Sequence, residues 1–179
     1  MFLTRIFASV FEFLLAVAMS GVVIYVTYRV FIKANPDFDM EDQIKKGNIA
    51  TGLLVGTILV CSSVFLQKGM ESVVGMFRLY IIAPDTSTLP FWQMLLLGIG
   101  HLALSLFMAV VTISATLRIF GRFTRRMQDG KELEKGNIAI GILLSSVVIV
   151  ATLYVAEGVG SLHKALVPQH SIGRIQVLK

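Results

Sequence analysis

Charged side chains are scarce in this chain of 179 residues, at 15% of the total, whereas soluble domains carry about a quarter. Apolar residues reach 55% and are gathered into long runs, and the mean hydropathy is +0.79. This composition excludes a disordered chain, a collagen-like chain and an ordinary soluble enzyme.

Cysteine is also scarce. Cys61 is the one cysteine, so the chain cannot form an internal disulfide, and its place in an apolar run gives no information on the redox compartment. Common catalytic motifs are missing, among them His-Glu-x-x-His, Cys-x-x-Cys, a phosphate-binding glycine loop and Gly-x-Ser-x-Gly. The three histidines lack metal-ligand spacing. We expect no catalytic residues, no metal site and no cofactor.

Four apolar runs are long enough to cross a membrane, since a bilayer core needs about 20 apolar residues in a helix. They cover about 6–31, 49–66, 91–120 and 138–155. The first resembles a cleavable leader, with a small-residue site at Ala16 to Ala18, but Glu12 interrupts it and the run continues past that site. We therefore expect a retained helix.

Lys and Arg are distributed unevenly between the two sides of the membrane. The side with the first and third loops carries ten and the other side carries six, and positive short loops stay in the cytoplasm. This predicts a multi-pass protein of the cell inner membrane with both termini on the non-cytoplasmic side. The net charge of +5 is then mostly a topology signal, and we expect no nucleic-acid partner.

The chain repeats itself at a shift of 89 residues. Lys-Gly-Asn-Ile-Ala-Thr-Gly at 46–52 recurs as Lys-Gly-Asn-Ile-Ala-Ile-Gly at 135–141, and the segment 27–31 matches 116–120 with its arginine retained. The interpretation is a first repeat over 1–90 and a second over 91–179. Each repeat is two crossings, so the copies are parallel and related by an axis along the membrane normal, which suits a pore or a plain bundle.

An amphipathic stretch follows the second crossing, at about 70–82, and a weaker one forms the tail after the fourth. We expect both to lie at the outer interface. The predicted fold class is therefore an all-α membrane protein, with four transmembrane helices as two parallel helix-hairpin repeats, plus interfacial amphipathic helices.

The repeated motif predicts a helix start. Asn48 and Asn137 precede apolar runs as N-caps, the preceding glycines allow a tight entry, and the preceding lysines reach the headgroup layer. The small residues that follow offer faces for close helix packing and for a homo-oligomer. Alternatively, the two asparagines converge near the axis and line an ion or ligand path. The motif residues are Lys46, Gly47, Asn48, Ala50, Gly52, Lys135, Gly136, Asn137, Ala139 and Gly141.

Arginines close the odd-numbered crossings. Arg29 and Arg118 are interpreted as cytoplasmic anchors, with binding of anionic lipid headgroups or of a partner as the alternative. The charged segments 39–44 and 129–134 lead into the two motifs. They are either solvated faces or a docking site for a soluble cytoplasmic partner.

Ionisable residues inside apolar helices predict a functional site. Glu12 lies about two turns into the first crossing, and the residue 89 positions later is His101. If these two positions face the axis, they form a buried ion pair or a proton- or cation-binding site. Glu157, at the outer end of the fourth crossing, can join them. A structural pair at the interface is the other interpretation.

With its duplicated Lys-Gly-Asn-x-Ala-x-Gly, the chain resembles the YjfL-type family of uncharacterised bacterial inner-membrane proteins, which is defined by a domain of unknown function. The resemblance covers about 15–160 and implies four helices in a bacterial inner membrane. It implies no activity and no catalytic residue.

Two functions remain after this reasoning. One is a non-catalytic membrane component or scaffold that docks partners through its cytoplasmic loops. The other is a small ion channel or proton-coupled transporter subunit that uses Glu12, His101 and the two motif asparagines.

Overall fold

Four long helices make up most of the protein. The computed structural model describes residues 2–33, 39–82 and 90–166. The long helices are α1 (Phe2–Thr27), α3 (Ile49–Ile82), α4 (Phe91–Phe123) and α6 (Ile138–Leu166). Each contains a segment long and apolar enough to cross a membrane, and the described ranges contain no strand. The predicted all-α membrane fold with four crossings is confirmed.

The predicted starts at 49, 91 and 138 coincide with the starts of α3, α4 and α6. The helix ends lie further along the chain than predicted. The first crossing continues from α1 into a π-helical turn, Tyr28–Lys33. Apolar run length thus locates the start of a crossing well, because a cap or a proline marks it, but it underestimates the end.

The stretch 70–82 differs from the expectation. It is not a separate interfacial helix but the last part of α3, which runs unbroken for 34 residues. The stretch after the fourth crossing likewise continues α6 as far as Leu166, and the rest of the predicted tail lies outside the described residues. A polar position such as Lys68 changes the surroundings of a helix without breaking its hydrogen bonds, so amphipathicity alone does not end it.

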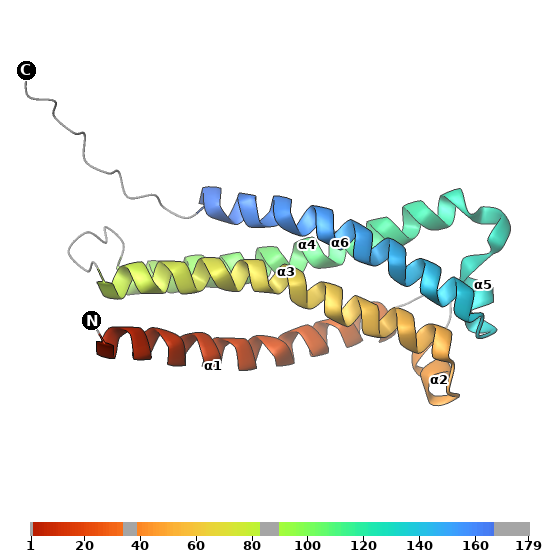
Figure 1. The fold of residues 1–179 in the computed structure, drawn as a ribbon, viewed down its shortest axis with the longest axis horizontal. Coiled ribbons are helices and arrows are strands. Elements are labelled where there is room, and N and C mark those ends of the chain that lie inside the picture. The colour runs from red at the N-terminus through yellow and green to blue at the C-terminus, as the bar shows by residue number, and fades with distance from the viewer. Residues whose placement is uncertain (1, 34–38, 83–89, 167–179) are drawn as a thin grey trace, which may run out of the picture.

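Two short helices join the long ones at one end of the bundle. They are α2 (Met40–Lys45) and α5 (Asp129–Glu134), the latter preceded by a 3₁₀ turn, Arg125–Met127. We call this the loop end. Figure 1 shows the start of α1 and the end of α6 both directed toward the opposite end, which we call the terminal end.

Helix α3 is the centre of the bundle. It packs against α1, α4 and α6, and α4 also packs against α6. Accordingly 56% of the crossing segment of α3 is buried, compared with 11% of the corresponding segment of α1. Helix α1 therefore offers most of its surface to the surroundings of the bundle.

The apolar core lies between α3, α4 and α6. Near the loop end, the backbones of α3 and α6 come very close, because a Cβ atom on Gly141 would lie 2.8 Å from the Cα and O atoms of Ala50. The main cluster comprises Phe31, Ala50, Leu54, Ile58, Cys61, Ile113, Leu133, Ile140, Leu144 and Val148. A second cluster follows toward the terminal end, with Phe65, Ala109, Ala156 and Val159.

Candidate functional site

Two histidines meet inside the bundle. His101 on α4 is 4% exposed and His163 on α6 is fully buried. Their Nδ1 atoms lie 2.7 Å apart, and the Nε2 atom of His163 lies 2.7 Å from the hydroxyl of Ser105, also fully buried. We call these three residues the histidine cluster.

The packing of α4 explains why this cluster is buried. The buried positions of α4 are Gly98, His101, Ser105, Ala109 and Ile113, which recur every three or four residues and so form one helix face. Helix α3 approaches this face at Gly69, where a Cβ atom would lie 3.0 Å from the carbonyl oxygen of His101 and 3.1 Å from the Cβ atom of Ser105. A side chain at Gly69 would push the two helices apart.

The cluster has two equivalent hydrogen-bond arrangements. A neutral imidazole has one nitrogen that donates and one that accepts. If His101 donates from Nδ1, then His163 accepts there and donates from Nε2 to Ser105; if His163 donates, every bond reverses. A single added proton makes His163 a donor to both neighbours. The geometry can therefore accommodate one extra proton on His163.

Other buried hydroxyls lie on α3 and α6, on the loop-end side of the cluster. Thr51 and Ser62 on α3 and Ser145 on α6 are buried, and none of their side-chain oxygens has a hydrogen-bond partner in the described part of the chain. Thr152 lies beside the thiol of Cys61. Unpartnered buried hydroxyls are uncommon in proteins and require an explanation such as bound water.

The structure does not bring Glu12 and His101 together. Glu12 is exposed on α1 and forms a 2.8 Å ion pair with Arg78 of α3. Glu157 is exposed and pairs with Lys68 at 2.8 Å. The suggestion that Glu12, His101 and Glu157 share one polar core does not match these contacts, because α1 presents the Glu12 position away from α4.

Sequence reasoning missed His163, the partner of His101. The signal was present, because His163 follows Thr152, Ala156 and Val159 at helical spacing, and all four are buried. It was overlooked because the predicted fourth crossing ended at 155. Lys68 was missed as the partner of Glu157, although the two are 89 positions apart.

The motif asparagines serve as caps. The side-chain oxygen of Asn48 accepts from the N–H of Thr51 at 3.1 Å, and that of Asn137 accepts from Ala139 at 3.2 Å. The preceding glycines adopt φ angles of 79° and 82°, in the region that favours glycine. The predicted caps and tight entries are confirmed. The amide of Asn48 also reaches the carbonyl oxygens of Leu133 and Glu134, at 2.9 and 3.1 Å.

The two asparagines therefore fasten the loop end and do not share a path. The amide of Asn137 lies 3.1 Å from Glu132, and that of Asn48 lies 3.1 Å from Gln43.

Charged groups at the loop end have shifted pKa values. The pKa of the Glu132 carboxyl lies below its usual value, mainly because of a hydrogen bond from Lys135 and next because of one from Asn137. A hydrogen bond to Glu41 raises the pKa of Lys45, and one to Asp42 raises that of Lys46.

The predicted small-residue faces are divided between inside and outside. Ala50 and Gly141 are buried against each other in the α3–α6 contact, whereas Gly52 and Ala139 are exposed. The first pair is thus already used within one chain and is not available for a homo-oligomer.

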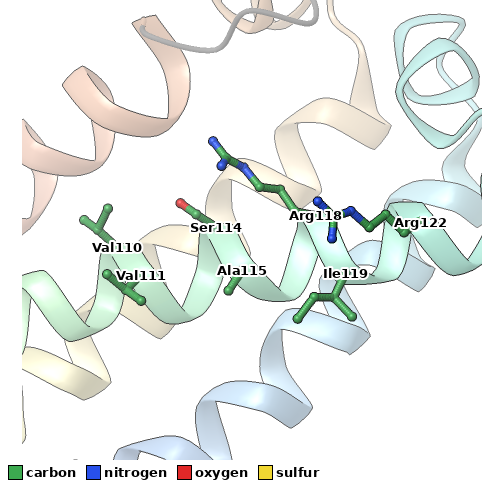
Figure 2. Close-up of a pocket in the computed structure, with 7 residues that line it drawn as sticks. All are labelled: Val110, Val111, Ser114, Ala115, Arg118, Ile119 and Arg122. Carbon is green, nitrogen blue, oxygen red and sulfur yellow. The ribbon is translucent and has the colours of Figure 1, made fainter.

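The arginine anchors lie at the loop end. Arg29 and Arg118 are both exposed. Figure 2 shows Arg118 and Arg122 on the last turns of α4, beside a shallow groove of about 400 Å³. The groove is otherwise lined by Val110, Val111, Ser114, Ala115 and Ile119.

The described residues contain no group of three His, Cys, Asp or Glu side chains that could hold a metal ion.

No curated protein and no solved structure matches the chain. One family does match, a domain of unknown function called DUF350, over residues 5–159. The expected membership of a family defined by a domain of unknown function is confirmed, and the YjfL-type name stays a prediction. With four helices able to span a membrane and a match over most of its length, the chain belongs to the DUF350 family of domains of unknown function.

Proposed function

We propose that this multi-pass membrane protein is non-catalytic and works as a small proton-coupled channel or transporter subunit, with the histidine cluster as its proton-binding site. The observation that carries the proposal is the 2.7 Å contact between the Nδ1 atoms of two buried imidazoles. Ionisable residues buried in membrane bundles are costly and typically mark proton relays.

The hydrogen-bond chemistry favours proton transfer over a static pair. Reversing the two tautomers moves each proton by one hydrogen bond, without moving a helix. His101 and Ser105 both come from α4, and His163 comes from α6, so a change in protonation also alters the contact between two crossings. Uptake of a proton is thereby coupled to helix packing.

The buried hydroxyls of Thr51, Ser62 and Ser145 support a path from the cluster toward the loop end. Water bound to these groups would satisfy them and continue the hydrogen-bonded chain. A proton-coupled role accounts for the cluster and for the hydroxyls together.

The test is proton flux into sealed proteoliposomes that contain a pH-sensitive dye, driven by a potassium diffusion potential. We expect flux with the wild-type protein and loss of it in His101→Gln and in His163→Gln. Glu12→Gln is the matched control, because Glu12 is an exposed residue of an ion pair and should leave flux unchanged.

Equal flux in the wild type and both histidine variants would contradict the proposal. So would flux no greater than in empty liposomes, when correct insertion has been verified by protease protection. The first result would move the path elsewhere, and the second would leave docking as the function.

A docking scaffold is the second candidate, and a specific observation favours it. Arg122, Arg125 and Arg126 are exposed at the loop end and form no ion pair within the described residues. In contrast, Lys45, Lys46 and Lys135 each pair with a carboxylate of their own loop. Arginines without intramolecular partners suit an acidic surface of a soluble partner.

Affinity purification from cells tests this candidate. The variant Arg122→Gln with Arg125→Gln and Arg126→Gln should lose any partner that the wild type retains. The matched control is Lys45→Gln with Lys46→Gln, which removes two charges from the other loop. Recovery of the same partner by the arginine variant would count against docking at this site.

We also propose the bacterial inner membrane as the location, with the loop end in the cytoplasm. The excess of Lys and Arg on that side supports this orientation. Thiol labelling of single cysteines at Gly130 and at Ser161 in intact cells, in a Cys61→Ala background, would test it. Labelling of Gly130→Cys alone would contradict it.

A further inference from the structure

We propose that two copies of this chain associate head to tail in the membrane, with α6 of one copy packed along α1 of the next. The inference is independent of the proposed function. It rests on a comparison of equivalent positions in the two halves of the chain, related by the shift of 89 residues.

The first observation concerns α4 and α1. Gly98, His101, Ser105, Ala109 and Ile113 are the buried positions of α4. The equivalent positions of α1 are all exposed. Helix α1 therefore has a complete counterpart of the buried face of α4 that is exposed, with the ion pair of Glu12 to Arg78 at its edge. These positions are Ser9, Glu12, Ala16, Ser20 and Ile24.

The second observation concerns α3 and α6. Phe65 is fully buried, and Cys61 and Gly69 are buried on the same face of α3. The equivalent positions on α6 are Val150, Tyr154 and Gly158, and all three are exposed, Tyr154 by 80%. Helix α6 thus exposes the counterpart of a face that α3 buries.

These two exposed faces correspond to the two sides of one existing interface. Within the chain, α3 of the first half packs against α4 of the second. A shift of 89 residues turns α3 into α6. The equivalent partner of α6 is then the first helix of a following copy, because α1 is the equivalent of α4. Within one chain α1 packs along α3 and has no comparable packing against α6, and in Figure 1 α3 lies between them.

The chemistry of the two faces suits close packing. In the α3–α4 contact, Gly69 receives Ser105, with 3.1 Å between its constructed Cβ atom and that of Ser105. The equivalent pair is Gly158 and Ala16, and nothing lies within 4 Å of a Cβ atom at Gly158. Small residues let membrane helices approach closely, and Ser9, Ala16 and Ser20 place three of them along α1. Within the chain, Phe65 packs beside Ala109. In the proposed contact, the exposed Tyr154, the equivalent of Phe65, would pack beside Ser20, the equivalent of Ala109.

A second copy is the occupant that this pattern indicates, rather than lipid or an unrelated helix. The exposed faces are complementary to each other and not to themselves. They also continue a contact that the chain already makes. Such a contact is heterologous, so its rotation determines whether the copies close into a ring.

Cysteine cross-linking in native membranes tests this arrangement. In a Cys61→Ala background, one tagged copy carries Ala16→Cys and a differently tagged copy carries Gly158→Cys. The equivalent Cβ separation within the chain is close to the 3.5–4.5 Å, or about 3.8 Å on average, found in disulfides. We therefore expect a cross-linked pair bearing both tags after mild oxidation. Ser9→Cys with Leu162→Cys, the counterparts of Gly98 and Val73, should behave in the same way.

Leu14→Cys with Leu153→Cys is the matched control, because both positions are exposed but lie outside the two faces. Cross-linking no stronger than in this control would overturn the proposal. A cross-link between two Ala16→Cys copies would indicate a symmetric dimer instead. In a single chain that carries both Ala16→Cys and Gly158→Cys, an intrachain disulfide without an oligomer would show that α1 closes on α6 of its own chain. Either result would refute the head-to-tail contact.

Discussion

The Lys-Gly-Asn motif occurs twice in this chain, and its two copies differ in what they contact. Both copies share the local structure, with a glycine at positive φ and an asparagine that caps the next helix. Only the first copy reaches across the bundle, where Asn48 bonds two carbonyl groups at the end of α5. Asn137 bonds within its own loop.

For the last glycine of the motif, it is the second copy that contacts another helix. Gly141, in the second copy, lies against the backbone of Ala50, whereas Gly52, in the first copy, has open space around it. A repeated sequence therefore determines the turn and the cap. Contacts with the neighbouring helix determine which copy of a given motif residue the fold requires. Four measurements test how far equivalent positions in the two halves of the chain differ.

The largest expected effect comes from His163, whose equivalent in the first half is Val74. His163→Ala leaves His101 and Ser105 without their buried partner, and each unsatisfied group costs about 1–3 kcal/mol. We expect a large fall in the SDS concentration that unfolds the protein. Glu12→Ala is the control, since an exposed ion pair contributes only about 0–1 kcal/mol. Equal effects of the two variants would contradict the buried cluster.

The glycine pair comes next. Gly141→Ala places a Cβ atom 2.8 Å from backbone atoms of Ala50, so α3 and α6 must move apart, at a cost of about 1–3 kcal/mol. Gly52→Ala has room and gains about 1 kcal/mol of helix propensity. Thermal unfolding in detergent should therefore show opposite shifts. A stabilised Gly141→Ala variant would show that the helices are not in close contact there.

The asparagines should differ by a smaller amount. Asn48→Ala and Asn137→Ala both lose a cap, worth about 0.5–2 kcal/mol. Asn48→Ala also loses its bonds to the α5 carbonyls, each worth about 0.5–1.5 kcal/mol. We expect unfolding in SDS to rank Asn48→Ala as the less stable variant. Asn48→Asp keeps the capping oxygen and removes the donor, so it should fall between the wild type and Asn48→Ala; equal stability of the two alanine variants would contradict the cross-loop contact.

The smallest effect is a pH dependence confined to the second loop. Asn137 bonds Glu132, whereas Asn48 bonds the equivalent but uncharged Gln43. The folded-state pKa of Glu132 is lowered, so its contribution to stability is present above its unfolded pKa of about 4.5 and is lost as the pH falls through the lowered folded value.

Carboxyl NMR of the protein in detergent can follow this titration. The midpoint for Glu132 should lie below 4.5, the usual value, and should rise in Lys135→Ala, which removes the main cause. In Asn137→Ala it should rise less. A midpoint that neither variant changes would show that these hydrogen bonds do not form.

Much of this architecture was readable from sequence. Apolar run length gave four crossings and three helix starts, and the motif gave the glycine turns and asparagine caps, since these depend on residues adjacent in the chain. The partner of His101 could not be read in this way. It depends on where α6 ends and on which side of α4 faces α6, and both are set by packing. The face of α1 that carries Glu12 was unreadable for the same reason.

Helices α3 and α6 are long enough to indicate where the membrane surfaces lie. Lys68 and Glu157 each lie 19 residues after the first residue of their helix, about 28 Å along it at 1.5 Å per residue. That distance nearly equals the hydrophobic thickness of a bilayer, about 30 Å. If the caps lie at one surface, this ion pair lies close to the other, and His163 lies six residues further along α6, about 9 Å. The histidine cluster is then near the membrane surface at the terminal end, so a proton from the medium on that side reaches His163 over a short distance.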